Sequence, residues 1–134
     1  MTPTLILEVK SQEGFRPKPY CDTLGFLTIG YGVNLDNGIS ETVAAKLLEW
    51  QLAEAESKLS VLLPFWGLLS NNRQDVLTNM AFNLGVIGLM GFKNMLAAAQ
   101  DGNIDVVCAE MQNSKWAGQV KTRADYLIDK YRKG

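Results

Sequence analysis

The sequence predicts an α+β fold that is mainly helical. Glycine and short stretches of alternating apolar and polar residues are concentrated between Gly14 and Gly38, which is typical of strands joined by tight turns. In the rest of the chain apolar residues recur at intervals of three or four, which is typical of amphipathic helices. The 134 residues, 47% hydrophobic and 20% charged, have the composition of a soluble domain with a core. We therefore expect one domain over residues 1–134, with a small β-containing lobe on a helical body.

The small lobe is expected over about residues 14–40. Two short strands are predicted, Lys18–Tyr20 and Phe26–Tyr31, because both stretches are bounded by residues that favour turns. The turn between them is Asp22-Thr23-Leu24-Gly25, in which Gly25 can adopt a positive φ. A hairpin or meander should result.

The predicted helices account for most of the remaining chain. A first helix is expected over about residues 4–12. A long helix should begin at Glu41 behind the N-cap residue Ser40 and end before Pro64, because its apolar residues share one face: Leu48, Leu52, Ala55, Leu59 and Leu62. Four more helices are predicted, with a short turn bracketed by Gly88 and Gly91: Asn71–Leu84, Phe92–Gln100, Asn103–Met111 and Thr122–Tyr131.

The rare residue types restrict the chemistry that the chain can perform. There are two cysteines, Cys21 and Cys108, which we expect to be small buried thiols, with a bridge between them left open. The chain has no histidine, so papain-like cysteine catalysis and most zinc sites lack their usual partner. Acid and base catalysis must therefore fall to carboxylates. We expect the tryptophans Trp50, Trp66 and Trp116 to pack in the core.

The charges are distributed unevenly. The net charge is -1, but residues 115–134 are basic. These basic residues could favour an anionic polymer, or they could form a solvated helix face, and no motif accompanies them that would indicate nucleic acid. The chain starts without a secretory signal and has no apolar run of about 18 residues, so we expect no signal peptide and no stable membrane insertion.

Three polar residues could meet at one site. Glu13 lies at the predicted end of the first helix, Asp22 at the tip of the hairpin, and Thr28 in the following strand. Two carboxylates in different environments beside a hydroxyl group are suited to hydrolysis. By themselves, however, the spacings fit equally an aspartate that closes a turn and a threonine that fills a strand position.

The residues around Glu13, Asp22 and Thr28 carry a more specific pattern. The segment Gln12–Gly32 contains the elements E-G, Y-x-D-x-x-G and T-I-G-x-G in that order. It resembles the signature of the phage-type lysozymes, glycoside hydrolase family 24. The resemblance continues through most of the chain, in the segments Asn79–Gly85, Gly91–Asn94, Ser114–Trp116 and Thr122–Ala124.

The resemblance implies a role for each matched residue. Glu13 would be the general acid, Asp22 would act on the opposite side of the scissile bond, and Thr28 would help to place water. Glu13 would need apolar surroundings that raise its pKa, while Asp22 stays ionised. Arg123 matches a family arginine that reaches the catalytic glutamate and supports the acid by orienting it.

The residues themselves suggest where the sugar binds. Gly32 could let the glycan approach the strand closely, or it could mark a twist or bulge of the strand. Asn79, Phe82 and Asn83 share a helix face that could line the cleft, and a core position for Phe82 is left open as the alternative. The chain departs from the best-known relatives in having Val33 in place of a histidine, and three outer sugar-binding positions do not keep the expected residue type: Asn34, Met95 and Glu110.

At the level of the whole protein, the resemblance implies a lysozyme-like fold. A helix over about residues 41–63 would join the small lobe to a helical lobe, residues 64–134 with the N-terminal helix, leaving a cleft between them. The expected activity is hydrolysis of the β-1,4 bond between N-acetylmuramic acid and N-acetylglucosamine in peptidoglycan. It needs no metal or other cofactor.

The expected biology is that of a phage endolysin. The protein would be a monomer held in the host cytoplasm until a holin releases it to the periplasm and cell wall, where it would cause lysis. Three alternatives remain open: a lytic transglycosylase acting on the same bond, a catalytically silent wall-binding structural protein of a phage, and a bacterial or effector enzyme with the same chemistry.

Overall fold

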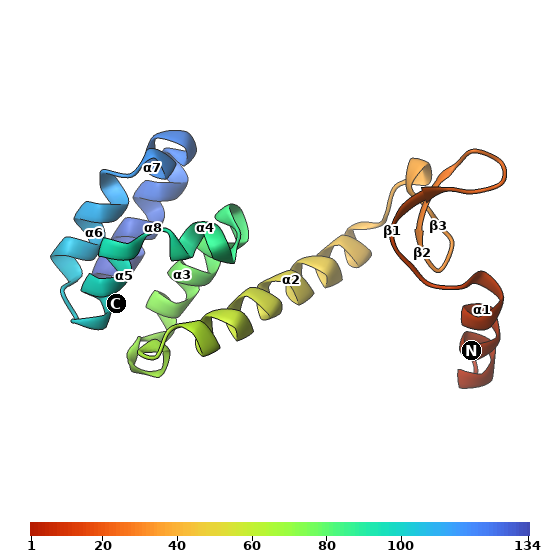
Figure 1. The fold of residues 1–134 in the computed structure, drawn as a ribbon, viewed down its shortest axis with the longest axis horizontal. Helices are drawn as coiled ribbons and strands as arrows, with labels where there is room; N and C mark the ends of the chain where they lie inside the picture. The colour runs from red at the N-terminus through yellow and green to blue at the C-terminus, as the bar shows by residue number, and fades with distance from the viewer. The chain divides into compact units, whose positions relative to one another are not determined.

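The computed structural model describes residues 1–134 and confirms an α+β architecture that is mainly helical (Figure 1). The chain forms two compact units, Met1–Lys46 and Leu47–Gly134, and each is described by itself. None of the helices combines the length and the apolar composition that crossing a membrane would require. The prediction of a single domain, with the N-terminal helix in the helical lobe, stays a prediction.

The first unit begins with helix α1, Pro3–Glu13, close to the predicted bounds. Thr2 caps the helix: its side chain accepts a hydrogen bond from the backbone N–H of Leu5, and Pro3 occupies the first helical position, where a missing N–H has no cost. Gly14 ends the helix with φ 73°, and its N–H donates to the carbonyl of Lys10. The helix therefore ends at Glu13, as predicted.

A three-stranded antiparallel sheet follows, in the order β1-β2-β3. Its strands are β1, Arg16–Cys21, β2, Leu27–Gly30, and β3, Val33–Asn34. In the register of the sheet Thr28 of the central strand lies between Tyr20 of β1 and Asn34 of β3. The predicted meander is confirmed, although its third strand is too short to be recognised from alternation. The 3-10 turn η1, Leu35–Asn37, is capped by the side chain of Asn34.

Helix α2, Glu41–Leu62, begins in the first unit and ends in the second. The predicted N-cap is confirmed, since Ser40 Oγ accepts a hydrogen bond from the N–H of Val43 at 3.3 Å. Of the predicted apolar face, Ala55 and Leu59 are buried, whereas Leu48 and Leu62 are exposed.

The second unit continues with six α-helices and one 3-10 turn. Helix α3 has the predicted bounds because Ser70 caps its start and Gly85, with φ 78°, ends it. The full set is η2 Trp66–Leu68, α3 Asn71–Leu84, α4 Val86–Met90, α5 Lys93–Gln100, α6 Ile104–Gln112, α7 Lys115–Val120 and α8 Thr122–Lys133.

Two local predictions for this unit were wrong or incomplete. Gly88 does not bracket a turn, because it lies inside the short helix α4. Helix α7 was not predicted, although its N-cap signal is present: the side chain of Ser114 accepts a hydrogen bond from the N–H of Ala117. Helices this short carry too few apolar residues for their period to be recognised.

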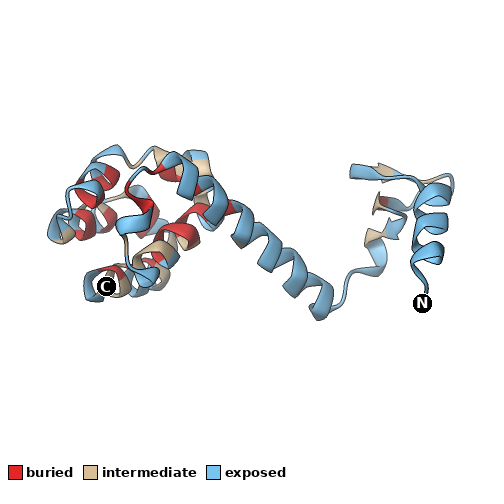
Figure 2. Cartoon of the chain, turned by 90° about the horizontal axis from the view of Figure 1, so that it is seen from below, coloured by how far each residue is buried: buried red, intermediate tan, exposed pale blue.

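The hydrophobic core lies in the second unit, where Figure 2 shows the buried residues gathered on the facing sides of the helices. In the first unit only Thr28 is buried. Trp66 and Trp116 are buried as predicted, at 7% and 3% exposure, but Trp50 is 60% exposed and does not belong to the core. Both cysteines are free thiols: Cys108 is buried as expected, whereas Cys21 is exposed, because it ends an edge strand.

Candidate active site

Glu13, the predicted general acid, lies directly against the backbone of Gly32. A Cβ atom added at Gly32 would be 3.0 Å from Oε2 of Glu13 and 3.4 Å from its Cδ, a tight contact that would require the carboxylate to shift by a few tenths of an ångström. Gly32 also has φ +86°, a conformation that disfavours any L side chain. The sugar contact predicted for Gly32 stays a prediction; the structure shows that the missing side chain leaves room for the carboxylate of Glu13. Glu13 is exposed in the first unit, so this unit does not itself supply the predicted apolar surroundings.

Asp22 closes the turn between β1 and β2. Its Oδ1 atom accepts hydrogen bonds from the backbone N–H groups of Leu24 and Phe26, both at 2.9 Å. Its own N–H donates to the carbonyl of Phe26, and Gly25, with φ +84°, completes the turn. The structural interpretation of Asp22 therefore holds. Within the first unit no hydrogen bond involves its Oδ2 atom, which can therefore bind a further group.

Thr28 is buried at 4% exposure in the central strand of the sheet. Its hydroxyl donates a hydrogen bond to the carbonyl oxygen of Phe26 at 2.9 Å. Because the only hydroxyl proton is used in this way, Thr28 can act toward a further partner only as an acceptor. The peptide groups of Phe26 thus connect Asp22 to Thr28, and the structure brings these two predicted residues together.

The remaining predicted residues lie in the second unit. Arg123 is partly buried and donates to the side-chain oxygen of Asn79 from Nε at 3.0 Å and from Nη2 at 2.7 Å. This forked contact holds the guanidinium group in one orientation on α3. The contact between Arg123 and Glu13 that the resemblance implies stays a prediction.

Asn83 and Phe82 are both exposed, but the side chain of Asn83 is tied to a neighbouring helix by a hydrogen bond. The side-chain oxygen of Asn83 accepts a hydrogen bond from the indole N–H of Trp116 at 2.8 Å. Phe82 is 41% exposed and so is not a core residue. The amide oxygens of Asn79 and Asn83 are used within the protein, whereas neither Nδ2 group has a partner, so both residues can still donate a hydrogen bond.

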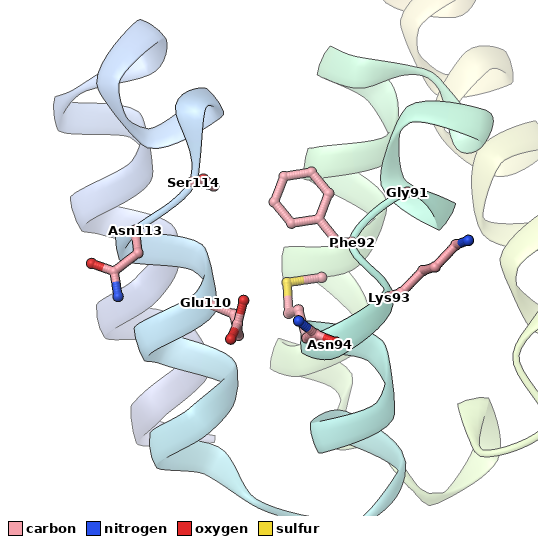
Figure 3. A pocket seen from close by; sticks show the side chains of 8 residues that line it. Gly91, Phe92, Lys93, Asn94, Glu110, Asn113 and Ser114 are labelled. Atoms are coloured by element: carbon pink, nitrogen blue, oxygen red, sulfur yellow. The ribbon is translucent and has the colours of Figure 1, made fainter.

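Two of the positions that departed from the family pattern share a pocket of about 420 Å³ (Figure 3). Met95 is buried on α5 and lines the pocket. Glu110 on α6 and Asn94 on α5 face each other across it. The side chain of Lys93 points away. The third position, Asn34, caps a 3-10 turn. A thioether and a carboxylate replace the expected residue types, and we assign these positions no sugar-binding role.

The basic C-terminal residues form ion pairs on the surface of the second unit. Lys130 pairs with Asp75 at 3.1 Å and Arg132 with Asp105 at 2.7 Å. Lys133 pairs with Asp129, one turn earlier on the same helix, at 2.8 Å. The hydrogen bond that Arg132 donates to the Asp105 carboxylate raises the pKa of Arg132. These cations favour the interpretation of a solvated, charge-paired helix face over a patch for anionic polymers.

Two buried residues with shifted pKa values, Cys108 and Tyr131, belong to the hydrophobic core of the second unit. Burial raises the pKa of the Cys108 thiol, against the lowering effect of Arg132. Burial likewise raises the pKa of Tyr131, against the lowering effect of Arg73. No group of three or more histidine, cysteine, aspartate or glutamate side chains is arranged to hold a metal ion.

The exposure of Trp50 was not predicted from the sequence, although the helical period of α2 indicates it. The buried positions Ala55 and Leu59 define one face of α2. Trp50 is five residues before Ala55, which at 100° per residue places it on a different part of the helix surface. Together with Phe82 it lines a pocket of about 360 Å³ in the second unit.

Comparison with known proteins shows which family the chain resembles. The model of the phage lysozyme family matches residues 10–129. The pre-baseplate central spike protein Gp5 of Enterobacteria phage T4 is 30% identical, over 87% of this chain and 25% of the spike protein. Two proteins of Dictyostelium discoideum are each 25% identical. "Probable T4-type lysozyme 2" matches over 94% of this chain and 92% of its own length, and "Probable T4-type lysozyme 1" over 90% and 88%.

The chain therefore spans a quarter of the spike protein but nearly the full length of both Dictyostelium relatives. The family match includes Glu13, Asp22 and Thr28 as well as Arg123, and so extends over both compact units. On this match, which extends over most of its length, the chain belongs to the phage lysozyme family.

Proposed function

We propose that the protein is a muramidase of the endolysin type, which hydrolyses the β-1,4 bond between N-acetylmuramic acid and N-acetylglucosamine. Family membership supports a lysozyme-type function. The observation that carries the finer proposal is that Asp22 and Thr28 are both hydrogen-bonded to Phe26, which leaves Asp22 Oδ2 unused and the Thr28 hydroxyl able only to accept. A binding role alone requires no such arrangement.

In the proposed reaction Glu13, in its protonated form, donates a proton to the glycosidic oxygen as the bond to the leaving sugar breaks. A water molecule donates one hydrogen bond to Thr28 Oγ1 and the other to Asp22 Oδ2. Its lone pair is thereby directed at the anomeric carbon, and Asp22 accepts the proton that the water loses. Gly32 keeps Glu13 in place by leaving room for its carboxylate.

Residues of the second unit are proposed to bind the substrate. The free Nδ2 groups of Asn79 and Asn83 can donate to the acetamido carbonyl of the sugars, and Phe82 offers an exposed ring. Arg123, held by Asn79, supports the orientation of the acid. Peptidoglycan is thus the proposed substrate, with no metal or other cofactor required for the reaction.

The test uses purified peptidoglycan, the wild type and Glu13→Gln. We expect hydrolysed reducing ends from the wild type, detected by mass spectrometry of the released muropeptides. The variant should be slower by a factor of about 10² to 10⁴, because it cannot donate the proton. Equal thermal unfolding of both proteins is the control. Equal turnover would remove Glu13 from the mechanism, and anhydro ends would indicate a transglycosylase.

We further propose that the protein waits in the host cytoplasm until a holin opens the membrane. Expression in bacterial cytoplasm should leave cells intact, and co-expression of a pore-forming protein should lyse them. Lysis without the pore would contradict this route. The proposed active form is a monomer, which sedimentation of the purified protein can check.

A second role is favoured by the similarity to a phage spike protein. In that role the chain is part of a virion and degrades the wall during entry. Immunoblots of purified particles separate the two roles, since a virion component stays with the particles, whereas an endolysin is found only in the lysate.

A further inference from the structure

Trp50 is the one tryptophan of the chain that is open to solvent. It is 60% exposed, whereas Trp66 and Trp116 are 7% and 3% exposed. A single exposed ring is common at protein surfaces, so what makes Trp50 informative is the pocket that it lines with a second exposed aromatic residue. Nothing derived above for the reaction uses this residue.

Trp50 lines a pocket of about 360 Å³ formed by α2, α3 and α4. Helix α2 contributes one face, with Gln51, Glu54 and Lys58 beside Trp50. On the other side Phe82, at the end of α3, is the second exposed aromatic residue. The pocket is lined further by Ala55, Ala81 and Val86.

The polar groups around the two rings are available to a ligand. Glu54 and Lys58 are one helical turn apart, but they do not form one of the ion pairs of the structure. Gln51 adds an amide that can both donate and accept. An aromatic platform bordered by an amide, a carboxylate and an ammonium group suits a ligand with apolar faces and polar edges.

We propose that this pocket holds one N-acetylated sugar ring of the glycan strand, with the ring faces of Trp50 and Phe82 against the axial C–H groups of the pyranose. Lys58 complements the lactyl carboxylate of a muramic acid residue, and Gln51 and Glu54 hydrogen-bond hydroxyl and acetamido groups. A purely apolar partner would leave these three polar side chains desolvated without partners, which is unfavourable. The inference rests on the proposed function for its substrate class.

The experiment follows the intrinsic tryptophan fluorescence of Glu13→Gln, so that the ligand is not consumed. The probe is the tetramer of N-acetylglucosamine. Because Trp116 is hydrogen-bonded to Asn83, a proposed substrate-binding residue, a change on titration is assigned to Trp50 only if it is absent from the Trp50→Phe variant. We expect a saturable blue shift of the emission, since the sugar removes water from the indole. Titration without any change at concentrations at which calorimetry detects binding would overturn the proposal.

Variants in the same background sharpen the test. Trp50→Ala should weaken calorimetric binding by about three- to tenfold, the factor expected for loss of an aromatic contact, and Trp50→Phe should restore part of it. The matched control is Leu68→Ala, because Leu68 is 88% exposed and lies outside the pocket. Equal affinity of Trp50→Ala and Leu68→Ala would contradict the proposal.

Failure of the inference and failure of the proposed function give different results. If the wild type hydrolyses peptidoglycan but Trp50 does not respond, the function stands and the pocket is not a subsite. If Trp50 responds to the tetramer but neither the wild type nor Glu13→Gln releases muropeptides, the pocket binds glycan and the proposed catalysis is wrong. Lys58→Gln, which removes only the charge, should weaken binding of muramic acid-containing fragments more than binding of the tetramer.

Discussion

The two compact units differ in what holds their side chains in place. In the Met1–Lys46 unit, which carries Glu13 and Asp22, only Thr28 is buried, and the geometry depends on hydrogen bonds to the backbone and on glycines with positive φ. In the Leu47–Gly134 unit the geometry depends on a packed apolar core. We therefore expect substitutions in the first unit to act mainly on catalysis and those in the second mainly on stability.

The largest expected effect is on stability and comes from the core of the second unit. Leu59 is fully buried, so Leu59→Ala should lower the free energy of unfolding by about 2–5 kcal/mol. Leu7→Ala in the first unit should change it by no more than about 0.5 kcal/mol, because Leu7 is 67% exposed. Urea unfolding monitored by circular dichroism measures both. An equal loss of unfolding free energy in Leu7→Ala and Leu59→Ala would show that the first unit also depends on apolar packing.

Substitutions of Asp22 should affect both stability and catalysis, and two different variants separate these effects. Asp22→Ala removes the acceptor of two backbone N–H groups and should cost about 1.5–3 kcal/mol. Asp22→Asn keeps an acceptor at Oδ1, so the turn and the unfolding free energy should be largely preserved while hydrolysis is lost. Thermal unfolding and peptidoglycan turnover are measured in parallel. An active Asp22→Asn variant would show that the carboxylate charge is not needed.

Gly32→Ala, compared with a matched control, should distinguish displacement of the Glu13 carboxylate from backbone strain as the cause of lost activity. Alanine at φ +86° costs about 1–2 kcal/mol, and its Cβ would displace the Glu13 carboxylate. We expect turnover to fall by about ten- to a hundredfold, since small displacements of a reacting group are expensive. The matched control is Gly38→Ala, which has φ +71° but nothing within 4 Å of the added Cβ. It should lose similar stability and keep its activity; equal losses of activity would mean that backbone strain alone is responsible.

The smallest effect is expected from pH. The folded state raises the pKa of Cys108 and of Tyr131 by burial, so above a pH of about 8.5 the unfolded chain releases protons that the folded chain retains. Stability should therefore decrease as the pH rises beyond this value. Urea midpoints at pH 7, 8.5 and 10 test this, and the decrease should be shallower in Cys108→Ala. Identical slopes for the two proteins would exclude Cys108 as the cause.

Much of the fold could be predicted because its signals are local. The bounds of α3 follow from Ser70 before it and Gly85 after it, and the end of α1 follows from Gly14. Short elements were missed, as β3 and α7 show, because two to six residues contain too little of a period. Trp50 was misplaced because a count of apolar residues does not say which face each occupies.

The residues of the candidate site could be predicted from the sequence, but the hydrogen bonds that they form could not. The motif elements identify Glu13, Asp22 and Thr28, yet no spacing reveals that Asp22 uses Oδ1 to close the turn or that Thr28 uses its only proton on Phe26. Nor does a pattern of glycines indicate which one borders a carboxylate. These features depend on the path of the backbone, which sequence periodicity does not specify.

The role of Phe26 has an evolutionary consequence. Its N–H and carbonyl groups hold Asp22 and Thr28 in register, whereas its side chain is 44% exposed. Natural drift or a saturation library should therefore accept many residue types at this position, with proline excluded because it lacks the N–H. A position can thus be variable in sequence while its peptide group remains indispensable, so a search for active-site positions by invariance alone would overlook it.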